Sequence, residues 1–236
     1  MHQTLRALLV NVNPFLFAAL LLVASGLEAA PDLATTLKNM DQAAAKFEGM
    51  KADIQRLSYT AIVDDKNVES GQILVRRDKA RAITLLMEIK EPTPKTLAVK
   101  GTKAEIYHPR IGEVEEYNLS KHKNDLERAY SLGFGTSGTF LKDNYAIRIL
   151  GEESVASQPA VRLELTPKDA DLLRRTPKIE IWVSTQNWSA IQQKVHELSG
   201  DYTLNTYSNI TLNPGLKESD LQLKLPKNVK RVYPQR

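Results

Sequence analysis

The sequence predicts a mainly β fold with a few short helices, in which one antiparallel sheet curls into a barrel or half-barrel. Apolar and polar residues alternate with a period of two over about ten or eleven short segments. Clusters of turn-forming residues separate these segments at short intervals, as at positions 64–67, 100–103 and 185–187. Only two or three stretches have the period of 3.6 that is typical of a helix.

The first 30 residues have the pattern of an export signal. Arg6 precedes an apolar stretch at positions 15–24, and small residues follow it. The stretch is shorter than the roughly 20 apolar residues of a membrane-spanning helix. We therefore expect residues 1–30 to be a signal peptide, cleaved near positions 26–30, and the mature protein to work in the periplasm. An uncleaved membrane anchor is the alternative.

Length and composition predict a single domain over residues 31–236, which is enough chain for a sizeable core. The sequence contains no cysteine, which favours a bacterial periplasm over a eukaryotic exterior, where disulfides are common. Its 32 basic and 28 acidic residues give a net charge of +4, a smaller excess than nucleic-acid binding usually needs. We expect a monomer with no nucleic-acid partner.

Two amphipathic segments are predicted to be helices that cover the sheet. The first begins near Asp32 and ends before Gly49, and the second begins at a capping residue, Asn124, and ends at Gly133. A third helical turn is expected around positions 216–221. The apolar stripes of the two helices supply the residues that we expect to form a lid, namely Leu37, Met40, Phe47, Leu126 and Tyr130.

The alternating apolar positions of the strands are predicted to share one face of the sheet. They are Leu57, Tyr59, Ile73, Val75, Ile83, Leu85, Met87, Ile89, Leu97, Val99, Ile147, Ile149, Leu163 and Ile181. Two or three short helices cannot fill the volume over so many inward side chains as efficiently as a second sheet would. The pattern therefore favours a hydrophobic cavity under a helical lid, and a fully packed interior is the alternative.

Arg77 is the charged residue that this pattern makes unusual. It has the same strand parity as Ile73 and Val75, so a continuing strand places its guanidinium on the apolar face, where an unpaired charge is costly. There it could act as a latch that bonds backbone carbonyls of the lid or a ligand ester, with its stem packed on apolar neighbours. The alternative is that the strand ends at Val75 and that Arg77 lies in the turn before Asp78.

Motifs for catalysis and metal binding are weak. Positions 133–138 match the dinucleotide fingerprint, but they follow a helix in an antiparallel pattern, so we interpret them as a lid loop. The four histidines, His2, His108, His122 and His196, do not have the spacing of metal ligands. We expect no enzyme activity, no metal and no cofactor. A serine, histidine and aspartate assembled from distant positions would make a hydrolase, the alternative that sequence leaves open.

Several short motifs occur in a particular order along the chain. They are the helix that ends in Phe47, followed by positions 71–77, 100–109, 165–168, 179–183 and 221–229. In this order they resemble the LolA-type family of periplasmic outer-membrane lipoprotein carriers, with Arg77 at the place of the family's characteristic arginine. Two features depart from the family pattern. Asp78 stands where proline is common, and Ile83 and Leu85 replace the usual tryptophan or phenylalanine of the next strand.

The resemblance implies an incomplete barrel closed by helices and a carrier with no catalytic step. Its hydrophobic concavity would take the acyl chains of lipoproteins, or related acylated lipids, from an ATP-driven release complex of the inner membrane. It would hand them to an outer-membrane acceptor. A periplasmic sensor or scaffold with the same fold is the first rival, and a hydrolase or lyase of envelope lipids is the second.

Overall fold

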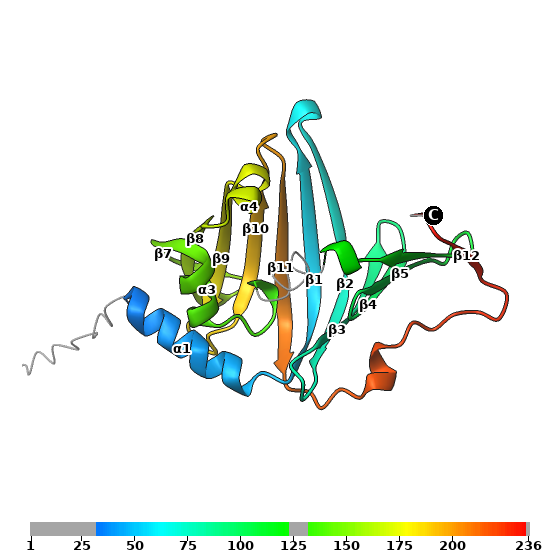
Figure 1. The fold of residues 1–236 in the computed structure, drawn as a ribbon, viewed down its shortest axis with the longest axis horizontal. Helices are drawn as coiled ribbons and strands as arrows, with labels where there is room; N and C mark the ends of the chain where they lie inside the picture. Colours follow the sequence, from blue (N-terminus) through cyan, green and yellow to red (C-terminus); the bar gives the residue numbers. More distant parts are fainter. Residues whose placement is uncertain (1–31, 123–131, 235–236) are drawn as a thin grey trace, which may run out of the picture.

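The computed structural model describes residues 32–122 and 132–234, and one open sheet of 12 strands dominates them (Figure 1). The strand order is β12-β6-β5-β4-β3-β2-β1-β11-β10-β9-β8-β7. The strands are β1 Gly49–Thr60, β2 Asp65–Arg77, β3 Ile83–Glu91, β4 Lys95–Lys100, β5 Lys103–His108, β6 Glu113–Asn118, β7 Tyr145–Val155, β8 Gln158–Pro167, β9 Lys178–Ser184, β10 Ala190–His196, β11 Tyr202–Leu212 and β12 Lys230–Val232. Every pairing is antiparallel except that of the short β12 with β6.

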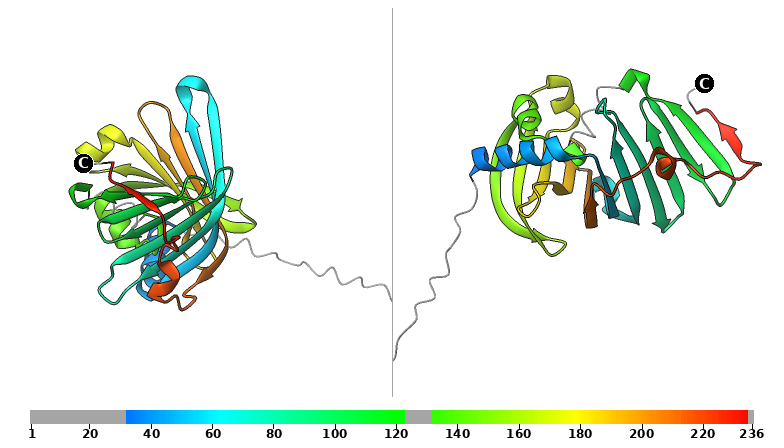
Figure 2. Two further views of the ribbon diagram at one scale, coloured as in Figure 1. Left: turned by 90° about the vertical axis from the view of Figure 1, so that its right-hand side faces the viewer. Right: turned by 90° about the horizontal axis from the view of Figure 1, so that it is seen from below.

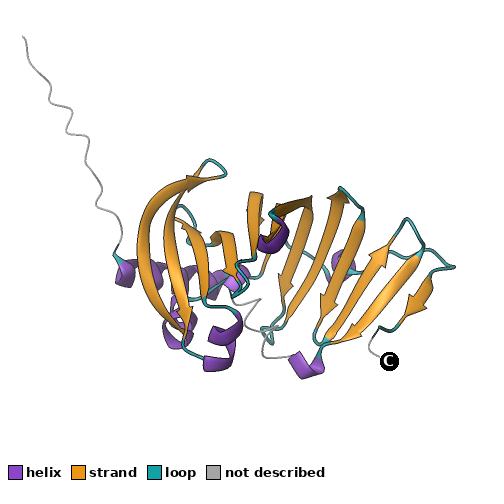
Figure 3. Ribbon diagram, turned by 90° about the horizontal axis from the view of Figure 1, so that it is seen from above, coloured by secondary structure: helices purple, strands orange, loops and turns teal. Residues whose placement is uncertain are grey.

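The sheet is curved, and β7 and β12 are its two unjoined edges (Figures 2 and 3). The predicted fold class, a curved antiparallel sheet that forms an incomplete barrel, is therefore confirmed, with 12 strands in place of the expected ten or eleven. The predicted signal peptide at 1–30 and the lid residues Leu126 and Tyr130 lie outside the described residues. No helix within the two described ranges is long and apolar enough to cross a membrane.

The helices are short and gather near the β7–β11 end of the sheet (Figure 1). They are α1 Leu33–Lys46, α3 Gly138–Asn144 and α4 Ala170–Arg175, with 3₁₀ turns η1 Ala61–Val63, η2 Ser120–His122 and η3 Glu218–Leu221. The predicted first helix corresponds to α1, whose N-cap Asp32 accepts a hydrogen bond from the Thr35 amide at 2.8 Å. The predicted helical turn near 216–221 corresponds to η3. The sequence pattern did not predict α3 or α4.

We call the face on which α1 and α3 pack the inner face, and the opposite one the outer face. Two apolar clusters occupy the inner face. The first lies mainly on β1 to β5 with Phe47 and Phe134, and the second lies on β7 to β10 with Met40 of α1 and Leu141 of α3. The inner face of the long curved sheet is therefore stabilised by two separate cores, because no single short helix can cover its whole length.

The register of β1 corrects one prediction from the sequence. Ala52 of β1 lies opposite Ile73 of β2, so the even-numbered residues of β1 face inward. Leu57 and Tyr59 are odd-numbered and face outward, where the Tyr59 ring packs on Tyr202 with 4.9 Å between ring centroids. The prediction that Leu57 and Tyr59 share the face of Ile73 is wrong. The strand begins six residues earlier than the alternation at 55–63 indicated, and its opposite parity decides the buried face.

The helix α3 is held tightly against α1. A Cβ atom built on Gly138 would lie 2.1 Å from the carbonyl oxygen of Leu37, so only glycine allows this approach. The next residue, Thr139, donates from its amide and its hydroxyl to the carboxylate of Asp41, each at 2.9 Å. These contacts join the two helices into one cover over the second cluster.

Candidate functional site

The inner face brings together all of the predicted lining residues except Leu57 and Tyr59. Eight are at most 9% exposed, namely Ile73, Val75, Leu85, Met87, Ile89, Val99, Leu163 and Ile181. Four are partly buried against the same two clusters, namely Ile83, Leu97, Ile147 and Ile149. Most of the lining is thus covered by the protein's own segments in this state, so a guest molecule must displace some of that cover.

The covering residues come from α1 and from the loop at 132–137. Phe47, which follows α1, belongs to the first cluster, and Met40 of α1 belongs to the second, where Leu37 is partly buried. These are three of the predicted lid residues. Phe134 was not predicted, although it is 7% exposed in the first cluster. An apolar residue between two glycines was the sequence signal that could have identified it.

Arg77 is the last residue of β2 and lies opposite Ile83 on the inner face. Its Nη1 donates to the carbonyl oxygen of Ala44 at 3.0 Å, and its Nη2 donates to those of Phe134 and Gly135 at 3.3 and 3.2 Å. The alternative in which the strand ends at Val75 is excluded. One guanidinium therefore bonds the end of α1 and the 132–137 loop together, through backbone oxygens from two separate covering segments.

Packing around the Arg77 head explains one glycine of the 133–138 motif. The guanidinium carbon lies 4.9 Å from the centroid of the Phe47 ring. Gly135 has φ +61°, and a Cβ there would lie 2.6 Å from the Phe47 ring and 2.7 Å from Arg77 Nη2. Burial lowers the pKa of Arg77, and the nearby charge of Arg81 lowers it further. An arginine nevertheless stays cationic at neutral pH, so Arg77 keeps its full set of donors. We call Arg77 and its three backbone acceptors, the carbonyl oxygens of Ala44, Phe134 and Gly135, the Arg77 clasp.

A cavity of about 400 Å³ borders this clasp. Its lining includes Phe47, Arg77 and the turn that follows β11, at 213–216. Asn213 in that turn accepts from the amides of Glu48 and Gly49 at 2.8 and 3.2 Å and donates to the carbonyl of Lys46 at 2.9 Å. Asn213 thus anchors the segment that follows α1, next to Arg77. The cavity leaves space beside the same arginine.

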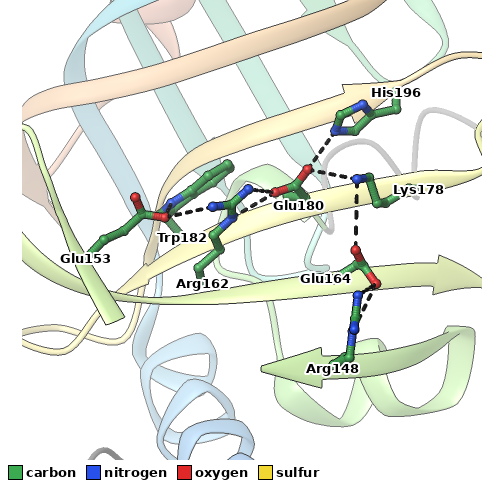
Figure 4. A network of polar contacts seen from close by, with 8 residues as sticks. All are labelled: Arg148, Glu153, Arg162, Glu164, Lys178, Glu180, Trp182 and His196. Carbon is green, nitrogen blue, oxygen red and sulfur yellow. Dashed lines mark hydrogen bonds and ion pairs between the residues drawn. The ribbon is translucent and has the colours of Figure 1, made fainter. Parts of the chain in front are cut away.

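The outer face of β7 to β10 carries a network of charges (Figure 4). At its centre is Glu180, which is only 2% exposed and accepts hydrogen bonds from Arg162 and, at 2.7 Å, from His196. Lys178 lies 3.4 Å away. Burial acts to raise the pKa of Glu180, but the hydrogen bonds from Arg162 and His196 and the nearby positive charges outweigh it and lower the value to about 2.

This network explains His196 as a structural residue, because its ring bonds a buried carboxylate. Within residues 32–122 and 132–234, no group of three or more histidine, aspartate and glutamate side chains could hold a metal ion. The network faces away from the two inner clusters and adjoins a third apolar cluster, which contains Trp182. Arg162 lies over the Trp182 ring, at 5.0 Å from its centroid. The geometry of the network is that of an ion-pair ladder that stabilises one face of a sheet.

Solved structures resemble this fold, whereas no family model matches the sequence and no curated protein matches it in sequence. In the complex structure of Pseudomonas aeruginosa MucA/MucB, a chain matches at 14% identity over 82% of this chain, with a TM-score of 0.51. An uncharacterized conserved protein from Thermus thermophilus matches at 10% identity over 84% of this chain and 96% of its own, with a TM-score of 0.52.

A LolA superfamily protein from Nitrosomonas europaea matches at 14% identity over 82% of this chain and 99% of its own, with a TM-score of 0.39. The resemblance to the LolA-type family that the sequence predicts accords with this match. At identities of 10–14%, all three likenesses concern architecture alone. This chain spans 62% of the length of the chain that it matches in the MucA/MucB complex.

Proposed function

We propose that this protein is a periplasmic carrier that shelters acyl chains of lipoproteins, or of related lipids, on its apolar inner face. The observation that carries the proposal is the Arg77 clasp. A charged side chain on an apolar face is bonded to three neutral backbone oxygens of the cover, at 3.0 to 3.3 Å. Ester and amide carbonyls of an acylated cargo offer the same kind of acceptor, so cargo can replace the cover at Arg77 without leaving the charge unpaired.

The energetics of carriage suit a weakly held cover. Burying an acyl chain yields about 0.8 kcal/mol for each CH₂ group, so a chain gains by replacing the side chains that cover the inner face. A typical hydrogen bond adds about 0.5–1.5 kcal/mol to stability, so three bonds at Arg77 make a modest barrier to opening. Cargo then shifts the equilibrium from the covered to the open state, and its departure restores the covered state.

The finer parts of the proposal concern where the cargo comes from and goes. The protein is exported by the signal peptide at 1–30 and acts as a monomer. It receives lipoproteins from an ATP-driven release complex of the inner membrane and delivers them to an outer-membrane acceptor. The proposal includes no catalytic step, because carriage requires only that the apolar face opens and closes.

Native mass spectrometry tests the proposal directly. The protein is purified from its own envelope after membrane extraction and compared with delipidated protein, and both are titrated with a fluorescent fatty-acyl probe. We expect bound lipid in the first sample and saturable probe binding in the second. Protein that is consistently empty and that does not bind the probe would argue against carriage.

A second candidate function is that of a sensor or scaffold that binds a misplaced lipoprotein or a protein segment without transferring it. The match to a chain of the MucA/MucB complex favours it, since that structure contains a protein partner. Labelled lipoprotein in inner-membrane vesicles separates the two functions. A carrier releases the label into the soluble fraction in the presence of the donor complex and ATP, whereas a sensor binds at the vesicle and releases none.

A further inference from the structure

Three polar side chains cross the inner face between the two apolar clusters. Arg56 of β1 lies opposite Asn205 of β11, and Asn205 lies opposite Gln193 of β10. Residues directly opposite in antiparallel strands share a face, with Cβ atoms about 4.5–5.5 Å apart. Ile54 of the first cluster precedes Arg56 by two positions, and Ile181 of the second cluster lies opposite Gln193. We call Arg56, Asn205 and Gln193 the polar row.

The polar row has hydrogen-bonding groups that the described part of the chain does not satisfy. Gln193 is 7% exposed, and its amide makes no side-chain hydrogen bond with any described residue. The Nε atom of Arg56 is buried and also lacks a partner. Glu69 lies opposite Arg56 on β2, but its carboxylate is paired with Lys95. A buried polar atom without a partner is unfavourable, so Arg56 Nε, in one row with a Gln193 amide that makes no side-chain hydrogen bond, indicates a site that a ligand completes.

Tyr207 adds a donor to the same place. It lies opposite Ile54, is 3% exposed, and its hydroxyl makes no hydrogen bond with a described residue. A Cβ atom on Gly133 would lie 3.9 Å from Tyr207 Oη and 4.0 Å from Gln193 Oε1, so both polar groups lie next to the space that this glycine leaves free. Burial raises the pKa of Tyr207, so its hydroxyl stays a neutral donor.

We propose that the polar row and the Tyr207 hydroxyl bind the anionic oxygen group of an amphiphile, a carboxylate or a phosphate, whose hydrocarbon part lies on the neighbouring apolar clusters. The guanidinium, the hydroxyl and the amides of Gln193 and Asn205 are all donors. An anionic oxygen group is an acceptor, and its negative charge would pair with the positive charge of Arg56. The inference rests on the proposed function and names the chemical class of its cargo.

Four amphiphiles with the same chain test the assignment by displacement of a fluorescent acyl probe from delipidated protein. They are dodecanoate, dodecyl phosphate, dodecanol and dodecyltrimethylammonium, each used below its critical micelle concentration. We expect the two anions to bind about tenfold more tightly than dodecanol, as one charge-assisted hydrogen bond would provide. Arg56→Gln should remove this preference and leave dodecanol binding unchanged. Arg148→Gln, on the outer face, should keep it.

The outcomes separate this inference from the proposed function. Equal binding of all four amphiphiles, or displacement of the probe by none of them, overturns the inference and leaves carriage standing. Failure of the acyl probe itself to bind overturns carriage and the inference with it. Inorganic phosphate is the further arm. Displacement by phosphate at the concentration at which dodecyl phosphate acts would show a site for a free anion and overturn the assignment to an amphiphile.

Gln193→Leu provides a second test that does not depend on the stability of the Arg56 variant. If the Gln193 amide has a hydrogen-bond partner only when a ligand is bound, leucine removes an unsatisfied group from the empty protein. The melting temperature of the empty protein should then rise, and the preference for anions should fall. If the amide has a purely structural role, the melting temperature should fall and the preference should stay. The second result would overturn the inference.

Discussion

The Nη1 atom of Arg77 lies 3.0 Å from the carbonyl oxygen of Ala44. Ala44 lies three residues before Phe47, which covers the first apolar cluster. The same guanidinium holds the loop at 134–135 through Nη2. Opening of the inner face on this side must therefore break bonds to one side chain. That dependence makes Arg77 the most direct place to perturb the cover without changing the apolar lining.

Arg77→Leu should retain binding of an acyl probe but slow its release. The covered empty state loses three hydrogen bonds, whereas the loaded state loses only those that Arg77 makes with cargo carbonyls. The loaded state therefore becomes relatively more stable, and release slows by about three- to tenfold, the equivalent of one hydrogen bond. Stopped-flow fluorescence during transfer of the probe to vesicles measures the rate. Arg76→Leu is the matched control, since it removes the same charge from the opposite face of the same strand. Unchanged release in Arg77→Leu would remove this residue from the mechanism.

Gly138→Ala should destabilise the protein by separating α3 from α1. The added Cβ would meet the Leu37 carbonyl oxygen at 2.1 Å, and this backbone atom cannot move aside without shifting a helix. We expect a loss of about 1–3 kcal/mol in the free energy of unfolding, measured by chemical denaturation. Gly133→Ala is the control, because its Cβ would have no neighbour closer than 3.9 Å. Equal stability of the two variants would show that α3 does not pack on α1 as described.

Glu180→Gln should weaken the dependence of stability on acid pH. The pKa of Glu180 is about 2 in the folded protein, below its ordinary value of 4.5, so folding favours the charged carboxylate. This stabilisation is complete above pH 4.5 and is lost as the pH falls towards 2; it amounts to at most about 3 kcal/mol. Urea denaturation between pH 6 and 2.5 should show a steeper loss for the natural protein than for Glu180→Gln.

Glu152→Gln is the control for that measurement, since Glu152 is an exposed residue of the edge strand β7. It should have the pH profile of the natural protein. Parallel curves for the natural protein and Glu180→Gln would mean that the ion-pair ladder on the outer face does not contribute to acid stability.

Asn213→Gly should reduce stability by removing three hydrogen bonds while it preserves the left-handed backbone, φ +52°, at this turn. We expect the free energy of unfolding to fall by about 1–3 kcal/mol. Asn209→Gly is matched to it, with a similar φ of +51° and a single side-chain bond, to Asp53. A smaller loss is expected there. If the two variants lose the same amount, the bonds that join the end of α1 to the end of β11 are not stabilising.

Local sequence pattern was sufficient for the features that depend on near neighbours. The 3.6-residue period predicted α1, and alternation predicted most of the strands, because both signals act within a few residues. Parity with Val75 placed Arg77 on the apolar face for the same reason. The short helices α3 and α4 were missed, since seven and six residues hold too few periods to be recognised.

Long-range pairing determined the rest. Leu57 faces outward because Gly49 to Ile54 set the parity of β1 through their partners on β2, which the alternation after Gln55 did not reveal. The polar row joins β1 to β10 through β11, so Arg56 and Gln193 lie on one face although 137 positions of sequence separate them (193 − 56). A sequence contains the residues of such a row, but their proximity arises only when strands that are distant in the chain pair in one register.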